Sequence, residues 1–117
     1  LQKNSIIENI KYLQVHQMRV FTEFEDEINL VPEGIHQDGY NFIAMCCVSR
    51  KNISGAISNI YDESKNIVHS VELQEGEMLI LNDNKMYHDV TPITLMNNNN
   101  KEIKEGYRDV FVFTTIS

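Results

Sequence analysis

The sequence predicts an all-β fold of the sandwich, jelly-roll or barrel type, and two observations lead to this prediction. Many short segments rich in β-branched and aromatic residues follow one another, with turn-forming residues between them at close, regular intervals. The chain of 117 residues also has the length of one domain, and its apolar fraction of 42% is that of an ordinary globular protein. A single domain is therefore expected over residues 1–117.

A short helix is expected before the strands, because four aliphatic residues recur at helical spacing within residues 3–13. Alternating or continuous apolar stretches then predict strands at residues 15–24, 35–40, 42–50, 56–62, 67–73, 78–83, 86–93 and 107–117. Gly, Asn, Asp and Ser residues between these stretches predict turns. The Asn-rich residues 95–106 predict a flexible surface loop.

Charge and hydropathy exclude several classes of function. The net charge is −7, and Lys and Arg form no cluster, so a nucleic acid is not an expected partner. No apolar run approaches the roughly 20 residues that a membrane-spanning helix needs. The first residues lack the basic and apolar regions of a signal peptide, so no membrane association or secretion is expected.

The two cysteines indicate a reducing compartment. Cys46 and Cys47 are neighbours in an apolar strand, where adjacent side chains point to opposite faces and cannot form a disulfide bond with each other. We therefore expect two free thiols and a cytoplasmic location. Because the sequence begins with Leu1 rather than Met, we also expect that the domain lacks an N-terminal region.

A metal site is indicated by the motif His36-Gln37-Asp38. Side chains two positions apart in an extended segment point the same way, so His36 and Asp38 can bind one ion. A second, distant His would complete the two-histidine, one-carboxylate arrangement typical of non-haem iron(II) oxygenases. The motif alone is common by chance. His88 and His69 are equal candidates for the third ligand on spacing alone, whereas packing is the default interpretation for His16.

Three stretches of the sequence resemble a known family. PEGIHQDG (residues 32–39), YHDVTPI (87–93) and GYRDVFVFT (106–114) are similar, in this order, to the 2-oxoglutarate/iron(II)-dependent dioxygenases. The resemblance is to the subgroup that includes bacterial free L-isoleucine hydroxylases, and it covers nearly the whole chain. It implies a double-stranded β-helix jelly-roll, which agrees with the series of strands expected above.

The resemblance also implies the chemistry. It implies that His36, Asp38 and His88 bind Fe(II) and that Arg108 binds the distal carboxylate of 2-oxoglutarate. The implied reaction consumes dioxygen and hydroxylates an unactivated C–H bond of a small molecule, with release of succinate and CO₂. The subgroup indicates a free L-amino acid as the substrate.

Two arginines are expected in strands. Arg108 shares a strand face with Val110 and Val112, and a guanidinium on an apolar face needs a planar anionic partner such as a carboxylate. The alternative is an edge-strand arginine paired with an acid. Arg19 either contacts the substrate or cosubstrate or forms a structural salt bridge.

Two other classes of protein share this pattern. A cupin-like metal enzyme would keep the barrel and the metal site but would not use 2-oxoglutarate, so Arg108 would not affect its cosubstrate. A jelly-roll binding module without activity would have His36, Asp38 and His88 as unrelated surface residues. Metal binding and the effect of replacing Arg108 separate the three hypotheses.

Overall fold

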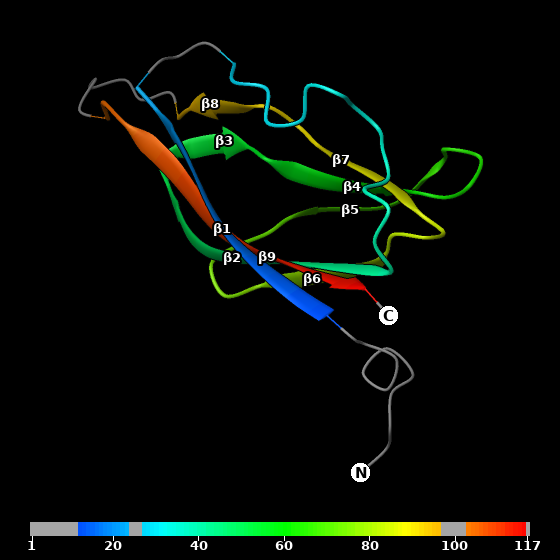
Figure 1. Ribbon diagram of the computed structural model, residues 1–117. Helices are drawn as coiled ribbons and strands as arrows, with labels where there is room; N and C mark the ends of the chain where they lie inside the picture. Colours follow the sequence, from blue (N-terminus) through cyan, green and yellow to red (C-terminus); the bar gives the residue numbers. More distant parts are fainter. Residues whose placement is uncertain (1–11, 24–26, 97–102, 117) are drawn as a thin grey trace.

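The computed structural model describes residues 12–23, 27–96 and 103–116, and these contain β-strands and no helix (Figure 1). The strands are β1 (Tyr12–Thr22), β2 (Phe42–Lys51), β3 (Ile53–Gly55), β4 (Ile57–Tyr61), β5 (Ile67–Glu72), β6 (Met78–Asn82), β7 (Tyr87–Val90), β8 (Ile93–Leu95) and β9 (Gly106–Ile116). Since the described part has no helix, it also has none that could cross a membrane. The predicted all-β class is confirmed.

The strands form a main sheet with the order β1-β9-β2-β6 and two smaller sheets, β5-β4-β7 and β3-β8. All the strand pairs are antiparallel. In Figure 1 the smaller sheets lie above the main sheet, so that the fold has two layers. The first and last strands pair along their whole lengths, from Tyr12 with Ile116 to Thr22 with Gly106.

The hydrophobic core lies between the layers. In β2 every second residue is buried, which places Ile43, Met45 and Cys47 on the inner face. They pack with Ile60 of β4 and Leu81 of β6 in one cluster. A second cluster joins the segments at the other end of the molecule and consists of Ile53, Ala56 and Ile93.

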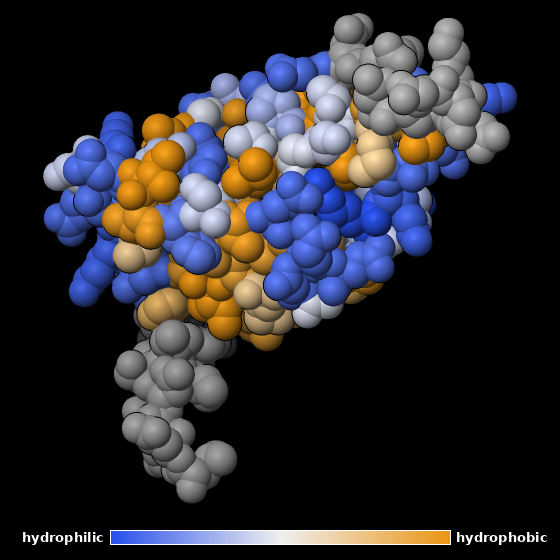
Figure 2. Space-filling view, turned by 180° about the vertical axis from the view of Figure 1, so that it is seen from behind, coloured by the Kyte–Doolittle hydropathy of each residue, from blue (hydrophilic) through white to orange (hydrophobic). Residues whose placement is uncertain are grey.

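The outer face of the main sheet is also apolar. Leu13, Met78 and Ile80 are exposed there, and the space-filling view shows hydrophobic side chains over the lower part of the molecule (Figure 2). A shallow hollow of about 210 Å³ on this face is lined by Leu13, Phe42, Ala44, Met78, Ile80, Phe113 and Thr115. The alternation of β-strand side chains therefore separates two apolar faces, of which only the inner one is covered by the smaller sheets.

The structure corrects the prediction in four places. Residues 3–11 of the predicted helix lie outside the described residues, and its last two residues, Tyr12 and Leu13, belong to β1. The strand expected at residues 35–40 is absent, because Gly34 and Gly39 adopt left-handed φ values of 74° and 87° that interrupt an extended backbone.

The third correction concerns the strand expected at residues 86–93. It is divided into β7 and β8 at Thr91 and Pro92, where the proline has no N–H to donate to a ladder. The residues expected as a turn, KNISG (51–55), include the short strand β3, which pairs with β8. At its end, Gly55 has a φ of 98°, and a Cβ there would lie only 2.0 Å from the carbonyl oxygen of Pro92. The crossing of these two segments therefore requires glycine.

Candidate metal centre

His36 and His88 are brought together by their own backbones. The N–H of each donates to the carbonyl oxygen of the other, at 3.0 and 2.9 Å, in an isolated antiparallel bridge. His88 lies in β7, whereas His36 lies in the segment that leads to β2. In a directly opposed antiparallel pair the side chains project to the same side, and the two ring centroids are 4.3 Å apart. The bridge thus places two imidazoles side by side.

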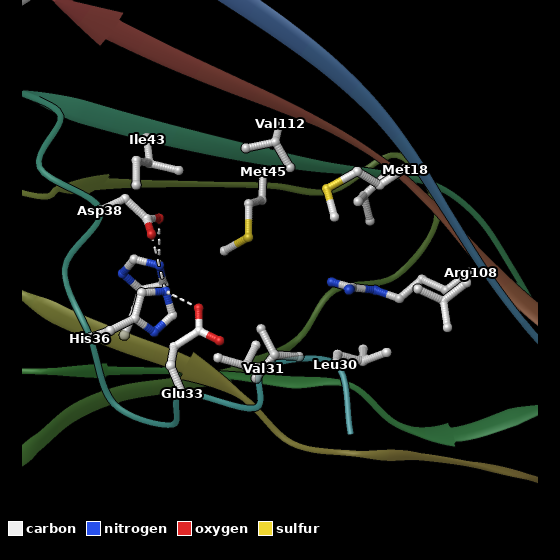
Figure 3. Close-up of a pocket in the computed structure, with 14 residues that line it drawn as sticks. Met18, Leu30, Val31, Glu33, His36, Asp38, Ile43, Met45, Arg108 and Val112 are labelled. Atoms are coloured by element: carbon white, nitrogen blue, oxygen red, sulfur yellow. Dashed lines mark ion pairs between the residues drawn. The ribbon is translucent and has the colours of Figure 1, made fainter. Parts of the chain in front are cut away.

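Asp38 completes a three-residue cluster with these histidines. Its Oδ1 lies 3.3 Å from Nε2 of His36, and its Oδ2 lies 3.3 Å from Nε2 of His88 (Figure 3). One ligand atom from each residue lies within 4.8 Å of the other two. The structure therefore unites the three predicted metal ligands, with the side chains of both histidines largely buried and that of Asp38 partly exposed.

The hydrogen bonds of His36 test whether a cation fits this cluster. Its Nδ1 lies 2.7 Å from the carbonyl oxygen of Gly34, which can only accept, so Nδ1 is the donor. In the neutral ring Nε2 is then an acceptor, and it faces Oδ1 of Asp38 and Oε1 of Glu33, which is 3.5 Å away. A metal ion between these atoms, or a proton on Nε2, satisfies acceptors that converge in this way. Two imidazole nitrogens and a carboxylate match the donor set of non-haem iron(II).

His88 is held in the form that binds a metal. Burial lowers the pKa of His88, and the neighbouring His36 acts in the same direction, while Asp38 and Asp83 oppose the shift. The neutral imidazole that results has a lone pair to offer. Its Nδ1 is 3.7 Å from Oδ1 of Asp83, too far for a hydrogen bond, and has no partner in the described residues.

Asp83 is a supporting residue that the sequence did not reveal. Its side chain is completely buried and accepts two backbone hydrogen bonds, from the N–H of Asp38 at 3.1 Å and from the N–H of Tyr40 at 2.8 Å. The carboxylate thereby fixes the segment that carries Asp38. The only sequence signal is an acid at the end of the strand predicted at residues 78–83, directly after the apolar residues of β6.

A cavity of about 250 Å³ connects the cluster to Arg108. In the close-up, His36, Asp38 and Glu33 lie at one end of this cavity and Arg108 at the other (Figure 3). Its walls are mainly aliphatic and come from several strands and from the segment before His36. The remaining lining residues are Met18, Val20, Leu30, Val31, Ile43, Met45, His88, Val90, Val110 and Val112.

Arg108 is a buried cation. Only 5% of the residue is exposed, and neither Nε nor Nη2 has a hydrogen-bond partner among the described residues. Burial lowers the pKa of Arg108, Cys47 opposes this shift, and Arg50 on the neighbouring strand adds to it. A buried guanidinium with free N–H groups is costly unless an anion meets it, and a carboxylate can do so through two parallel hydrogen bonds.

The structure does not bring Arg19 to this cavity. Its Nε and Nη2 donate to the two carboxylate oxygens of Asp109, at 2.6 and 2.8 Å, on the outer face of the β1–β9 pair. Its guanidinium also stacks over the ring of Tyr107. Of the two roles considered for Arg19, the structural salt bridge is the one observed. His69 and His16 are exposed and lie outside the cluster, so His88 takes the third position.

Comparison with known proteins gives the family. The family model of 2OG-Fe dioxygenases matches residues 2–114. The chain belongs to this family. Membership in the 2OG-Fe dioxygenase family implies Fe(II) and 2-oxoglutarate as cofactors and dioxygen as a reactant. Among curated proteins, none matches the chain.

Several solved structures of other proteins share the fold of this 2OG-Fe dioxygenase chain. A BsmA homologue from Methylobium petroleophilum PM1 is 27% identical with a TM-score of 0.76, over 91% of this chain and 41% of its own. IDO from Bacillus thuringiensis is 22% identical with a TM-score of 0.73, over 87% of this chain and 46% of its own. The Fe(II)/α-ketoglutarate-dependent dioxygenase TqaL is 21% identical with a TM-score of 0.72, over 89% and 41%. The chain thus spans less than half the length of these structures.

Proposed function

We propose that this protein hydroxylates an unactivated C–H bond of a small substrate, using Fe(II), 2-oxoglutarate and dioxygen. One oxygen atom enters the substrate, the other enters succinate, and CO₂ is released. The observation that supports this most directly is a single cavity with a two-histidine, one-carboxylate cluster at one end and the unpaired guanidinium of Arg108 at the other. A dicarboxylate has two ends, and this cavity offers a suitable group for each.

In this proposal His36, Asp38 and His88 would hold the iron through two imidazole nitrogens and a carboxylate. Bound iron supplies the activation of dioxygen. Gly34 keeps the proton of His36 on Nδ1, and Asp83 fixes the backbone of Asp38, so that the ligand atoms are oriented before a metal binds. Pre-orientation of this kind lowers the cost of assembling the reactants.

Arg108 binds the distal carboxylate of 2-oxoglutarate in this proposal. Its free Nε and Nη2 atoms can donate two parallel hydrogen bonds to the two carboxylate oxygens. The aliphatic walls, among them Val110, Val112 and Met45, exclude water and so strengthen this ion pair.

A free L-amino acid is the substrate class that we propose. The sequence resembles the amino acid hydroxylases in PEGIHQDG, YHDVTPI and GYRDVFVFT, and the cavity of about 250 Å³ is smaller than the roughly 300–1,000 Å³ of pockets for drug-sized ligands. Two free thiols, Cys46 and Cys47, are consistent with a cytoplasmic location.

The test compares two arginines on opposite faces of the same strand pair. Succinate formation is measured with Fe(II), ascorbate, 2-oxoglutarate and each free L-amino acid for the parent protein, Arg108→Ala and Arg19→Ala. We expect Arg108→Ala to raise the KM for 2-oxoglutarate about 30-fold or more, since truncating one partner of a buried ion pair costs about 2 kcal/mol or more. Arg19→Ala should leave this KM unchanged.

Two other outcomes would contradict the proposal. An unchanged KM in Arg108→Ala would indicate a metal enzyme that does not use 2-oxoglutarate. Equal iron binding by the parent protein and by His36→Ala and His88→Ala, measured anaerobically, would indicate that the cluster is no metal site.

A further inference from the structure

Glu33 is a second carboxylate at the metal end of the cavity. It lies three residues before His36, lines the cavity, and points into it beside Val31 (Figure 3). The position is set by a tight turn, in which the N–H of Gly34 donates to the carbonyl oxygen of Val31 at 3.0 Å. Oε1 of Glu33 thus comes within 3.5 Å of Nε2 of His36, while 56% of the side chain is exposed.

The contact between Glu33 and His36 would not be a hydrogen bond in a protein whose His36 holds a metal. The proton of a neutral His36 ring is on Nδ1, which donates to Gly34, and Nε2 would offer its lone pair to the metal. Among the described residues that line the cavity, the only cationic side chain is Arg108, which is at the other end. Water can reach the exposed part of the Glu33 side chain, and a donor group of a bound molecule can replace that water.

The charges in the cavity indicate the sign of that molecule. With iron(II) and 2-oxoglutarate bound, the two charges of the metal and the charge of Arg108 would balance Asp38 and the two carboxylates of 2-oxoglutarate. Glu33 would remain as a further negative charge on the wall of the cavity, with 56% of its side chain exposed. Such a carboxylate attracts a cation and repels an anion, and the neighbouring aliphatic walls add to this effect by less than they would for a fully buried group.

We propose that Glu33 binds a primary ammonium group of the substrate and so selects amine-bearing substrates. This inference rests on the proposed dioxygenase function, which it extends by naming the charge that the substrate carries beside the iron. A carboxylate and an ammonium group form a charge-assisted hydrogen bond, which also orients the substrate relative to the metal ligands a few ångströms away.

The experiment uses substrate-stimulated succinate formation as its readout. The probes are free L-amino acids, beginning with L-isoleucine, together with their N-acetyl derivatives, the corresponding 2-hydroxy acids, and primary amines that lack the carboxylate. The parent protein is compared with Glu33→Gln, with Glu33→Asp, and with Glu63→Gln as the control. Glu63 is an exposed acid in the turn between β4 and β5, away from the cavity. Metal and 2-oxoglutarate affinities are measured for every variant.

We expect only compounds with a free amino group to stimulate the parent protein. Glu33→Gln should raise the KM of such a compound about 10- to 100-fold, the size of one charge-assisted hydrogen bond. Glu33→Asp should give a smaller rise, and Glu63→Gln none. The slow, substrate-independent formation of succinate should persist in all variants, as should the affinities for Fe(II) and 2-oxoglutarate.

The remaining outcomes overturn the inference in distinguishable ways. An unchanged KM in Glu33→Gln, or equal stimulation by N-acetyl derivatives, would refute the ammonium site and leave the dioxygenase function intact. Weaker Fe(II) binding by Glu33→Gln would make Glu33 a metal ligand instead. Absence of any 2-oxoglutarate turnover in the parent protein would refute the proposed function, and the inference with it.

Discussion

The arginines on the two faces of the β1–β9 pair differ in burial and in their partners. On the outer face, Arg19 is mostly exposed and makes a two-point ion pair with Asp109. On the inner face, Arg108 is 5% exposed and has two unpaired nitrogens, although it directly precedes Asp109 in the chain. The alternation of strand side chains separates these neighbours by a full sheet thickness. We infer from this difference that the paired charge of Arg19 stabilises the fold, whereas the unpaired buried charge of Arg108 indicates a ligand.

We expect the largest effect from Asp83→Asn, because the buried carboxylate of Asp83 is hydrogen-bonded to the backbone that carries Asp38. Oδ2 of Asp83 accepts from the N–H groups of Asp38 and Tyr40, and Oδ1 also accepts from that of Asp38 at 3.2 Å, so an amide replaces one of these two acceptors with an NH₂ group that faces a donor. The segment of Asp38 should loosen, and the affinity for Fe(II) should fall about 10- to 100-fold. Anaerobic titration with Fe(II) or Co(II) measures this, and an unchanged affinity would show that Asp83 does not position the metal ligand.

Arg108→Met should stabilise the protein in the absence of 2-oxoglutarate. The substitution removes a buried charge with unsatisfied N–H groups, and such groups cost about 1–3 kcal/mol. The free energy of unfolding, measured by denaturant titration, should rise by about that amount, and 2-oxoglutarate should no longer add to it. A loss of stability in the ligand-free state would mean that Arg108 belongs with the paired, structural charges.

Arg19→Ala should have the smallest effect and should act on stability alone. The hydrogen bonds from Arg19 lower the pKa of Asp109, so their contribution is present above the unfolded-state pKa and is lost as the pH falls through the folded-state pKa. Melting temperatures of the parent and the variant should therefore differ slightly at neutral pH and converge in acid. A difference that grows toward low pH would reverse this assignment.

Much of the fold follows from local patterns in the sequence. The expected strands at 42–50, 67–73 and 78–83 agree with β2, β5 and β6 to within about one residue at each end. Alternation and turn residues are local signals, and they suffice here. The pairing of β3 with β8 is not local, since it depends on a crossing that only Gly55 permits, and the sequence pattern gave no sign of it.

The site was predictable to a different degree for each residue. His36 and Asp38 followed from their spacing, whereas His88 and His69 were equal until the family resemblance favoured His88. The deciding physical feature is the backbone bridge between His36 and His88, which joins residues far apart in the sequence. Asp83 escaped prediction for the same reason, because its partners lie more than forty positions away.

The pairing of β1 with β9 has a consequence for biosynthesis. β1 supplies Met18 and Val20 to the cavity, and its partner strand within the described residues is β9, which carries Arg108. At about 5–20 residues per second, a ribosome needs roughly 4–17 s to extend the chain from Thr22 to Gly106. Throughout this interval β1 is an unpaired, partly apolar strand, and such strands are what aggregation and chaperones act upon. The Arg108 end of the cavity can therefore form only after β9 has been synthesised.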